Sequence, residues 1–241
     1  MKLSLIVPAF NEEKLLGASL TEMRAAAAAF QYRGWEVELI VCDNNSTDRT
    51  AEIARAAGAI VVFEPVNQIA RARNAGAGAA SGDWFVFIDA DTHPSAELFT
   101  DVAEQIAGGR CLAGGVTVRL DEAPWQARLG EGFWNLLSRA RRWMAGSFIF
   151  VRADLFREVG GFNQAFFAAE ELDLSERLKA AARKRGGRVV ILNRHPVVTS
   201  GRKLKLYTPK ELRRILFRSI FGYKRFVTSR EAAFMWYDGR R

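Results

Sequence analysis

The 241-residue sequence lacks the features that mark several common classes of protein. It has two cysteines, Cys42 and Cys111, at no metal-binding or redox spacing, which excludes a disulfide-rich domain and a cysteine-based zinc module. Cys42 closes an apolar run, so we expect a buried free thiol in a reducing, cytoplasmic compartment. No apolar run approaches the roughly 20 residues that span a bilayer, and the apolar start at residues 3–7 is too short for a signal peptide.

Phosphate-binding loops rich in glycine are also missing. No Gly-x-x-x-x-Gly-Lys-Ser/Thr motif occurs, which excludes a P-loop enzyme. The segment that follows the first apolar run, Pro8–Glu13, is acidic and contains no glycine. A sugar-phosphate nucleotidyltransferase needs a glycine-rich, basic loop at this place to hold a triphosphate, so that activity ranks low.

The net charge of +8 is concentrated near the end of the chain. Residues 202–230 contain ten Lys or Arg and one acidic residue, whereas residues 1–201 carry 23 basic and 24 acidic side chains. We therefore predict a near-neutral domain over 1–201 and a basic, amphipathic helical extension over 202–241. Such an extension suits an anionic surface, including the inner face of a membrane, but a solvated helix face has the same composition. We expect no nucleic-acid partner.

Within this extension, Thr208 to Glu211 matches a helix capping box. An apolar stripe follows it, with basic residues to either side. That pattern is typical of a helix lying in a membrane interface, and equally of a helix packed on its own domain. The stripe consists of Leu212, Ile215, Leu216 and Ile220.

Apolar runs alternate with segments of helical periodicity, which predicts one α/β domain with a mostly parallel, mixed central sheet flanked by helices. The predicted strands are 3–7, 37–42, 59–63, 84–88, 111–119, 147–152 and 188–192. The predicted helices start at an Asn11 cap, at 46–47, at 69, at Pro94, at 125 and at 170, and a further helix after the strand at 147–152 ends at Gly160. The helix over 125–143 is rich in Trp and Arg, and can pack on the sheet or line an acceptor groove.

Two carboxylates, Asp89 and Asp91, directly follow the strand predicted at 84–88. Ligands of open parallel sheets bind beyond the carboxyl ends of the strands, and alternate residues of an extended segment point the same way. The pair can therefore share a hard divalent cation that bridges diphosphate oxygens. Taken alone, an Asp-x-Asp is more often a turn or a helix cap.

Three further motifs belong to the same edge of the predicted sheet. Asp43 ends the second strand and can accept a hydrogen bond from a nucleotide base, while Ser46 to Asp48 suit a helix start. Phe10, after the first strand, packs against a base or in the core. Arg73, in a helix of small residues, can reach a phosphate, with Arg71 as the competing candidate.

Together these motifs resemble the family-2 glycosyltransferases. That family's pattern is an apolar strand with Pro-x-aromatic-Asn-Glu, then Asp-(Asp/Asn)-x-Ser-x-Asp-x-Thr, Ala-Arg-Asn-x-Gly, and Asp-x-Asp after a strand, all present here in this order. A later stretch also matches. It comprises Gly146-Ser147-Phe148, Val159-Gly160-Gly161-Phe162 and Glu170-Glu171-Leu172-Asp173-Leu174, so that the resemblance covers residues 3–195.

The resemblance implies an inverting glycosyltransferase of GT-A fold, with a divalent metal (Mn or Mg) and a nucleoside diphosphate sugar, most commonly a UDP-sugar. It assigns the metal to Asp91 with Asp89, and His195 follows the last strand, where some relatives have a third ligand. It assigns the acceptor region to Gly146, Ser147 and Glu170. The nucleotide-binding residues that it implies are Pro8, Ala9, Phe10, Asn11, Glu12, Asp43, Arg73, Asp89 and Ala90.

One departure from the family pattern concerns the catalytic base. The family's usual base is the Asp of a Glu-Asp pair, and Glu171 occupies that position here. Glu170 is the alternative if the register is shifted by one residue. Asn44 replaces a second Asp, a change that we expect to be minor. A non-catalytic nucleotide-binding module or an adaptor for anionic surfaces is the second hypothesis, and the acceptor, a saccharide or a lipid-linked group, is not identified by the sequence.

Overall fold

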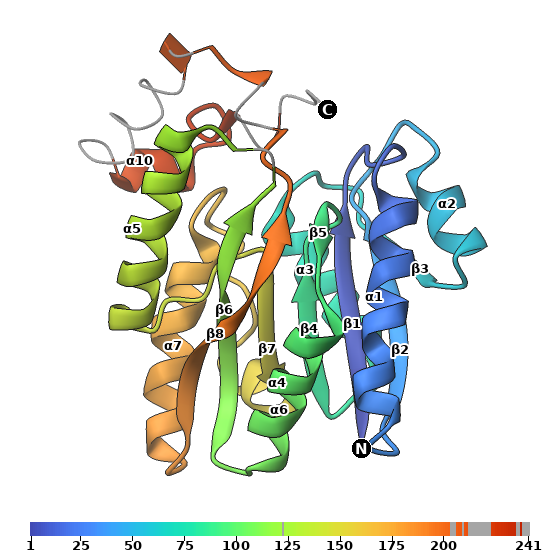
Figure 1. Ribbon diagram of the computed structural model, residues 1–241. Coiled ribbons are helices and arrows are strands. Elements are labelled where there is room, and N and C mark those ends of the chain that lie inside the picture. Colours follow the sequence, from blue (N-terminus) through green and yellow to red (C-terminus); the bar gives the residue numbers. More distant parts are fainter. Residues whose placement is uncertain (122, 203–205, 209, 212–222, 235–236, 238–241) are drawn as a thin grey trace.

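The computed structural model describes residues 1–121, 123–202, 206–208, 210–211, 223–234 and 237. Its first half alternates strands and helices (Figure 1), in the order β1 (Lys2–Ala9), α1 (Leu16–Gln31), β2 (Glu36–Asp43), α2 (Thr50–Ala56), β3 (Ile60–Phe63), α3 (Ile69–Ala79) and β4 (Trp84–Ile88). The second half contains β5 (Thr92–His93), α4 (Ala96–Ala107), β6 (Cys111–Leu120), α5 (Trp125–Arg141), β7 (Phe148–Arg152), α6 (Ala153–Glu158), α7 (Glu170–Lys184), β8 (Arg188–Thr199) and α10 (Tyr223–Thr228).

The strands form one mixed sheet in the order β3-β2-β1-β4-β7-β6-β8-β5. β1 is parallel to both β2 and β4, and β6 is parallel to β8. β7 lies antiparallel between β4 and β6. The predicted α/β class and the mostly parallel, mixed sheet are therefore confirmed.

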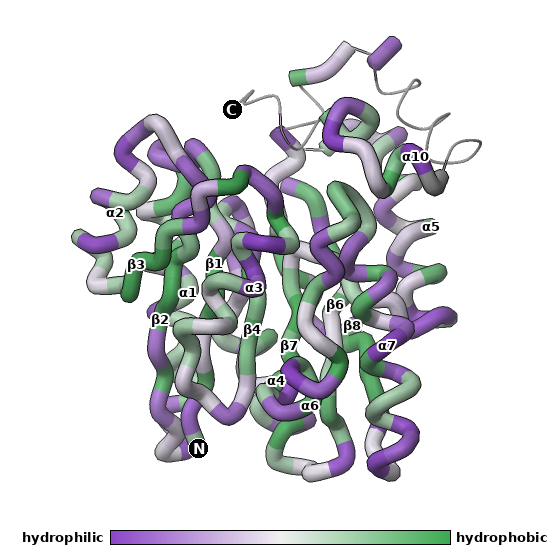
Figure 2. Tube along the Cα trace, turned by 180° about the vertical axis from the view of Figure 1, so that it is seen from behind, coloured by the Kyte–Doolittle hydropathy of each residue, from purple (hydrophilic) through white to green (hydrophobic). Residues whose placement is uncertain are grey.

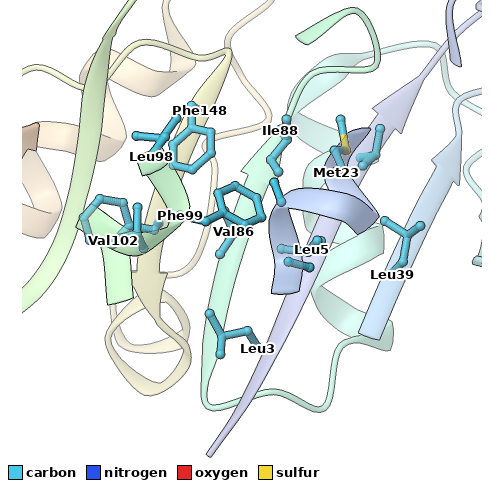
Figure 3. Close-up of a cluster of buried hydrophobic side chains, with 14 of the residues drawn as sticks. Leu3, Leu5, Met23, Leu39, Val86, Ile88, Leu98, Phe99, Val102 and Phe148 are labelled. Atoms are coloured by element: carbon cyan, nitrogen blue, oxygen red, sulfur yellow. The ribbon is translucent and has the colours of Figure 1, made fainter. Parts of the chain in front are cut away.

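Helices cover both faces of the sheet because the central strands are apolar on both sides. Along β1, Leu5 and Val7 pack in one hydrophobic cluster with α1 and α4, whereas Ile6 packs in a second cluster with α3, α6 and α7. Figure 3 shows the first cluster, where Met23 of α1 and Phe99 of α4 lie over the strand residues. Both cysteines are buried free thiols, as expected.

Three predicted helix starts are wrong, and the helix predicted from 46–47 begins only at Thr50, as α2. Asn11 does not cap α1: its φ is 53°, and its Oδ1 accepts a hydrogen bond from the backbone N–H of Thr47 at 2.8 Å. α1 begins at Leu16 without a side-chain cap. α4 begins at Ala96, and Ser95 is its N-cap, with its hydroxyl accepting from the Leu98 N–H at 3.2 Å. Asn11 bonds to a loop that is distant in sequence instead of capping a helix, which the sequence alone does not predict.

The last predicted strand is longer than expected. β8 continues to Thr199 because it pairs with β6 up to Leu120, which lies opposite Thr199, and its end also pairs with β5, where Thr92 lies opposite Thr199. β5 has two residues and was not predicted. This pairing holds the turn that carries Asp89 and Asp91 against the end of β8.

The described part of the C-terminal segment packs on the loop that precedes α7. Ala233 is fully buried there and Tyr237 is 8% exposed, in a cluster that includes Ala168. The capping box is present, since Thr208 and Glu211 exchange hydrogen bonds in both directions at 2.8 and 3.3 Å. The apolar stripe predicted after it (Leu212, Ile215, Leu216 and Ile220) lies outside the described residues. Across the described ranges, no helix is long and apolar enough to cross a membrane.

Candidate active site

A cavity opens at the edge of the sheet where β1 and β4 end, beside the first turn of α7. This is the edge that faces upward in Figure 1, toward α10. The topology explains the location, because parallel strands deliver their carboxyl ends, and the loops after them, to one edge. Of the residues predicted for the site, the cavity is lined by Pro8, Ala9, Phe10, Glu12, Arg73, Asp89, Ala90, Asp91, Gly146, Ser147, Glu170 and Glu171.

A buried arginine joins three of these segments. Arg73 is 1% exposed, and its guanidinium donates to Glu170 Oε1 at 2.5 Å, to Asp89 Oδ1 at 2.9 Å and to the Gly146 carbonyl at 2.8 Å. It also lies over the Phe162 ring, 5.1 Å from the centroid. A charge this deeply buried needs such partners. Arg73 therefore fixes α3, the turn after β4 and the start of α7 relative to one another.

The two aspartates stand on a tight turn at the end of β4. The Asp89 N–H donates to the Ser147 carbonyl at 3.2 Å, and the Thr92 N–H donates to the Asp89 carbonyl at 3.1 Å. The Asp89 side chain is 27% exposed and the Asp91 side chain 13% exposed, and both line the cavity. The two predicted aspartates thus line the same cavity.

These two carboxylates fit a cation that is shared with a substrate. In the described part of the chain, no group of three His, Cys, Asp or Glu side chains is arranged as a complete metal site. An oxygen-only pair suits Mg²⁺ or Mn²⁺, which take one or two protein carboxylates and complete their shells with water and phosphate oxygens. The donor set therefore matches a substrate-bridged ion and not a closed structural site.

Arg202 from the chain after β8 reaches the same place. Its guanidinium donates to both carboxylate oxygens of Glu12, at 2.5 and 2.6 Å, and lies 3.6 Å from Asp91 Oδ2. Its Nε is buried and has no hydrogen-bond partner within the described ranges. The basic segment thus begins with an arginine beside Glu12, which is predicted to bind the nucleotide, and Asp91, which is predicted to bind the metal.

The two glutamates at the start of α7 have different surroundings. Glu170 is 4% exposed and is held by Arg73, whereas Glu171 is only partly buried and its carboxyl faces Gly146. Burial, and next the nearby Glu170 carboxylate, raise the pKa of Glu171 to about 8. Glu170 is thus committed to an ion pair, while Glu171 remains able to exchange a proton near neutral pH.

Two residues of the predicted nucleotide set lie behind the cavity lining. Asp43 accepts a hydrogen bond from the Ser46 N–H at 3.0 Å, and Asn11 Oδ1 binds the Thr47 N–H. Asp43 therefore holds the loop after β2 in shape, and Asn11 ties that loop to the loop after β1. Asn44, which lines the cavity, donates to the Val66 carbonyl at 2.7 Å, a bond that an aspartate could not make.

His195 lies away from the cavity lining. Its Nδ1 is 2.9 Å from Asp101 Oδ2 on α4. His195 lies within β8, so its third-ligand role stays a prediction and requires a different arrangement of that strand.

Several cavity residues escaped the sequence analysis. Asn67 comes from the loop before α3, Ile69 is the first residue of α3, and 167–169 come from the loop before α7, where Ala169 has a φ of 58°. Tyr237 comes from the C-terminal segment, and its hydroxyl donates to the Phe167 carbonyl at 2.9 Å. No local pattern links these positions to the site. The basic run that starts at Arg202 was the one signal that pointed to the C-terminal segment.

Solved structures share this architecture. S. aureus TarS in complex with UDP-GlcNAc superposes with a TM-score of 0.67 at 20% identity, covering 98% of this chain and 69% of TarS. Glucosyl-3-phosphoglycerate synthase from Mycobacterium tuberculosis, solved with Mn²⁺ and UDP, gives 0.59 at 22% identity, covering 88% and 75%. A mannosyltransferase from Pyrobaculum calidifontis, solved with GDP-Man and Mn²⁺, gives 0.64 at 20% identity, covering 88% and 59%. The fold is that of the GT-A glycosyltransferases.

Sequence comparison is more specific. The model of Glycosyl transferase family 2 matches residues 4–168, and the chain belongs to that family. An uncharacterized glycosyltransferase of Mycobacterium tuberculosis is 34% identical over 142 residues, which are 57% of this chain and 61% of that protein. Undecaprenyl-phosphate 4-deoxy-4-formamido-L-arabinose transferase of Pseudomonas aeruginosa is 31% identical over 136 residues, 51% of this chain and 38% of that enzyme. The chain thus spans less than two thirds of the length of these two relatives.

Proposed function

We propose that this protein transfers a glycosyl group from a UDP-sugar to an acceptor hydroxyl, with inversion at the anomeric carbon and with the help of Mn²⁺ or Mg²⁺. The observation that carries the proposal is the convergence of Asp89, Asp91 and Glu171 on one cavity at the carboxyl edge of a GT-A sheet. The family match supports the reaction class. Solved relatives that contain UDP or UDP-GlcNAc support the nucleotide, although one relative contains GDP-Man.

The nucleotide lies along the loops after β1 and β2 in this proposal. Pro8, Ala9 and Phe10 line the cavity directly, and Phe10 supplies an aromatic face for a base. Glu12 can accept hydrogen bonds from ribose hydroxyls once Arg202 turns toward the diphosphate. Asn11 and Asp43 support these loops from behind.

The sugar–diphosphate unit lies over the turn after β4. Asp91, with Asp89, holds the divalent ion, which when bound offsets the negative charge of the departing diphosphate. Arg73 keeps Asp89 oriented, and Arg202 adds a second positive charge at the leaving-group side. His195 is the proposed third ligand.

Glu171 is the proposed general base. It takes the proton from the acceptor hydroxyl as the oxygen attacks, and Gly146 leaves the space in front of its carboxylate open because it has no side chain. A Cβ at residue 146 would lie 3.1 Å from the Arg73 guanidinium. Because Gly146 and Ser147 line the cavity beside Glu171, the acceptor approaches over these two residues in this proposal. A lipid-linked acceptor is supported by the relative that is named for undecaprenyl phosphate, and a saccharide is the alternative.

A panel assay tests the proposal. The protein is incubated with UDP-, GDP- and dTDP-sugars in the presence of Mn²⁺, Mg²⁺ or EDTA, and release of the nucleotide is measured. We expect release from one class of UDP-sugar that depends on the metal. A metal-dependent rise in melting temperature with UDP but no turnover on any donor, with or without polyprenyl phosphate or saccharide acceptors, would favour a nucleotide-binding module instead. Neither turnover nor a UDP-dependent shift would favour an adaptor.

A further inference from the structure

Helix α5 exposes its large apolar side chains, whereas an ordinary surface helix buries them against its own domain. Polar side chains face its own domain beside the half-buried Ala127 and Trp134. The Glu131 carboxylate accepts from the Leu120 N–H at 2.8 Å, and Asn135 exchanges hydrogen bonds with the Val118 backbone at 2.8 and 2.9 Å. Ser138 is its one buried residue and binds the Trp143 carbonyl at 2.6 Å. Hydrogen bonds to Glu131 and Asn135 therefore help to hold α5 on β6.

The opposite side of α5 is apolar and faces away from the domain. Its large side chains recur at spacings of four, four and three residues, which places them on one stripe of the helix. They are among the most exposed hydrophobic residues of the described chain. The exposed fractions are 68% for Trp125, 66% for Leu129, 69% for Phe133 and 66% for Leu136.

Positive charge borders this stripe. Arg128 and Arg139 lie along one side of it by helical position, and Arg141 lies beyond the other, with its guanidinium over the Trp143 ring at 5.3 Å. The only acidic residue of the helix, Glu131, points inward to β6. α5 stands at the margin of the molecule in both Figure 1 and Figure 2.

We propose that α5 is a docking helix for an anionic lipid surface, with the Trp125–Leu136 stripe inserted among the lipid chains and the arginines at the level of the headgroups. Trp, Phe and Leu on one face with Arg beside them is the composition of interfacial helices. A second copy of the chain fits less well, because a stripe one helix wide is small against the roughly 800 Å² that each partner contributes to a standard interface. Bordering arginines on both copies would also repel each other.

Docking through α5 would place the candidate active site close to the membrane. The chain leaves α5 at Arg141 and enters the cavity within a few residues, at Gly146 and Ser147. The Met144 N–H is anchored on the way by the Ser175 hydroxyl of α7 at 3.0 Å. The binding itself does not depend on the proposed transferase activity and is testable without a donor or an acceptor.

Sedimentation with vesicles tests the docking. The full chain is mixed with vesicles of phosphatidylcholine alone or of an equimolar mixture with phosphatidylglycerol, and the bound fraction is measured. We expect binding to the anionic vesicles that falls by about tenfold or more in Leu129→Glu/Phe133→Glu. Arg128→Gln/Arg139→Gln should lose most of the dependence on anionic lipid. Phe63→Glu is the matched control, since Phe63 is 60% exposed on the distant edge strand β3, and it should bind like the wild type.

Each alternative has its own outcome. Both Glu residues replace exposed side chains, so circular dichroism and the melting temperature should match those of the wild type. Absence of wild-type binding overturns the proposal. Undiminished binding by Leu129→Glu/Phe133→Glu also overturns it and assigns membrane contact to the basic extension. If light scattering finds a wild-type dimer that this double variant converts to a monomer, the stripe belongs to a second copy and the proposal fails.

Discussion

At the scale of single residues, the burial of one guanidinium separates the roles of two adjacent carboxylates. Arg73 binds Glu170 and Asp89, whereas among the described residues its contact with Glu171 is through charge alone. Removing one partner of a buried ion pair leaves an uncompensated charge and typically costs about 3–5 kcal/mol. Glu170 is thus tied to stability, and Glu171 is left for chemistry.

Substitution of each glutamate should separate these roles. Glu171→Gln is expected to lower kcat by about 10²- to 10⁴-fold with nearly unchanged UDP affinity, because a general base is lost. Its melting temperature near pH 7 should not fall, since a neutral amide replaces a carboxyl that is mostly protonated below its pKa of about 8. Glu170→Gln should lower the melting temperature markedly. Steady-state kinetics, calorimetry with UDP and thermal denaturation make the comparison; normal turnover in Glu171→Gln would show that the base is another residue.

The rate of transfer should depend on pH through Glu171. Its folded pKa of about 8 lies above the ordinary value, so the carboxyl of the free protein is mostly protonated at lower pH and cannot accept a proton. We expect kcat/KM to rise with pH, by about tenfold per unit well below this pKa, and to level off above it. A pH-rate profile under saturating metal measures this. The residual activity of Glu171→Gln serves as the control and should lack the dependence; a flat wild-type profile below pH 8 would contradict the assignment.

Asp91 should govern the metal dependence of nucleotide binding. Asp91→Asn keeps the shape of the turn after β4 but removes the charge proposed for the ion. In the wild type, UDP at about 100 times its Kd with Mn²⁺ should stabilise the fold by about 2.7 kcal/mol, and the variant should lose this shift while its melting temperature without ligand is retained. Undiminished metal-dependent transfer by Asp91→Asn would contradict the assignment of Asp91 as a metal ligand. His195→Ala in the same assay decides whether that ring contributes a third ligand.

At the scale of elements, α3 brings Arg73 to the site because the helix lies unusually close to β1. A Cβ at Gly76 would meet Ile6 Cγ2 at 2.6 Å, which is too short for any real contact. Small residues therefore line the α3 face that touches the sheet, where Ala70 is fully buried and Ala77 is 6% exposed. The Ala-Arg-Asn-x-Gly motif thus combines one charged residue with the packing that positions it.

Two glycines of α3 should respond in opposite ways to alanine. Gly76→Ala is expected to destabilise the protein by about 1–3 kcal/mol, since α3 must shift away from β1, and to weaken donor binding as Arg73 moves. Gly78→Ala has open space around its added methyl group and should stabilise the helix by about 0.5–1 kcal/mol. Urea denaturation of the pair measures both. Equal effects at the two positions would mean that backbone flexibility, and not the contact with Ile6, explains Gly76.

At the scale of the whole molecule, the C-terminal segment completes the cavity although it lies far from the other lining residues in sequence. Tyr237 lines the cavity, and its ring meets the Phe167 ring edge-on at a centroid distance of 5.7 Å. Val227 also accepts a backbone hydrogen bond from the Phe167 N–H at 2.6 Å. The loop that leads into Glu170 and Glu171 is therefore supported from outside the region matched by the family model.

Loss of this support should impair the site more than the fold. Tyr237→Ala is expected to raise the donor KM by about tenfold, because Phe167 and the following loop lose the ring and the hydrogen bond that hold them. Tyr237→Phe keeps the ring and should have a smaller effect, worth about 1 kcal/mol. KM and melting temperature of the two variants provide the measurement. Wild-type KM in Tyr237→Ala would mean that the contact contributes packing alone.

The sequence by itself determined the central strands and the order of the motifs. Runs such as 84–88 are apolar throughout because both faces of the sheet are covered, and Asp89 and Asp91 follow at the strand end where ligands bind. The resemblance in motif order and the resulting family assignment needed no coordinates. Helix starts were less predictable, because Asn11 serves a loop contact 36 residues away instead of capping α1.

Only the tertiary structure decided which charged groups meet. Arg73 and Glu170 are 97 residues apart, and Glu12 and Arg202 are 190 apart, so no local pattern predicts either pair. The orientation of α5 was also decided by packing: its Trp- and Arg-rich sequence fits a helix packed on the sheet, yet the hydrogen bonds of Glu131 and Asn135 to β6 turn its apolar stripe outward. Periodicity identifies the two faces of a helix, but contacts between distant segments select the face that is buried.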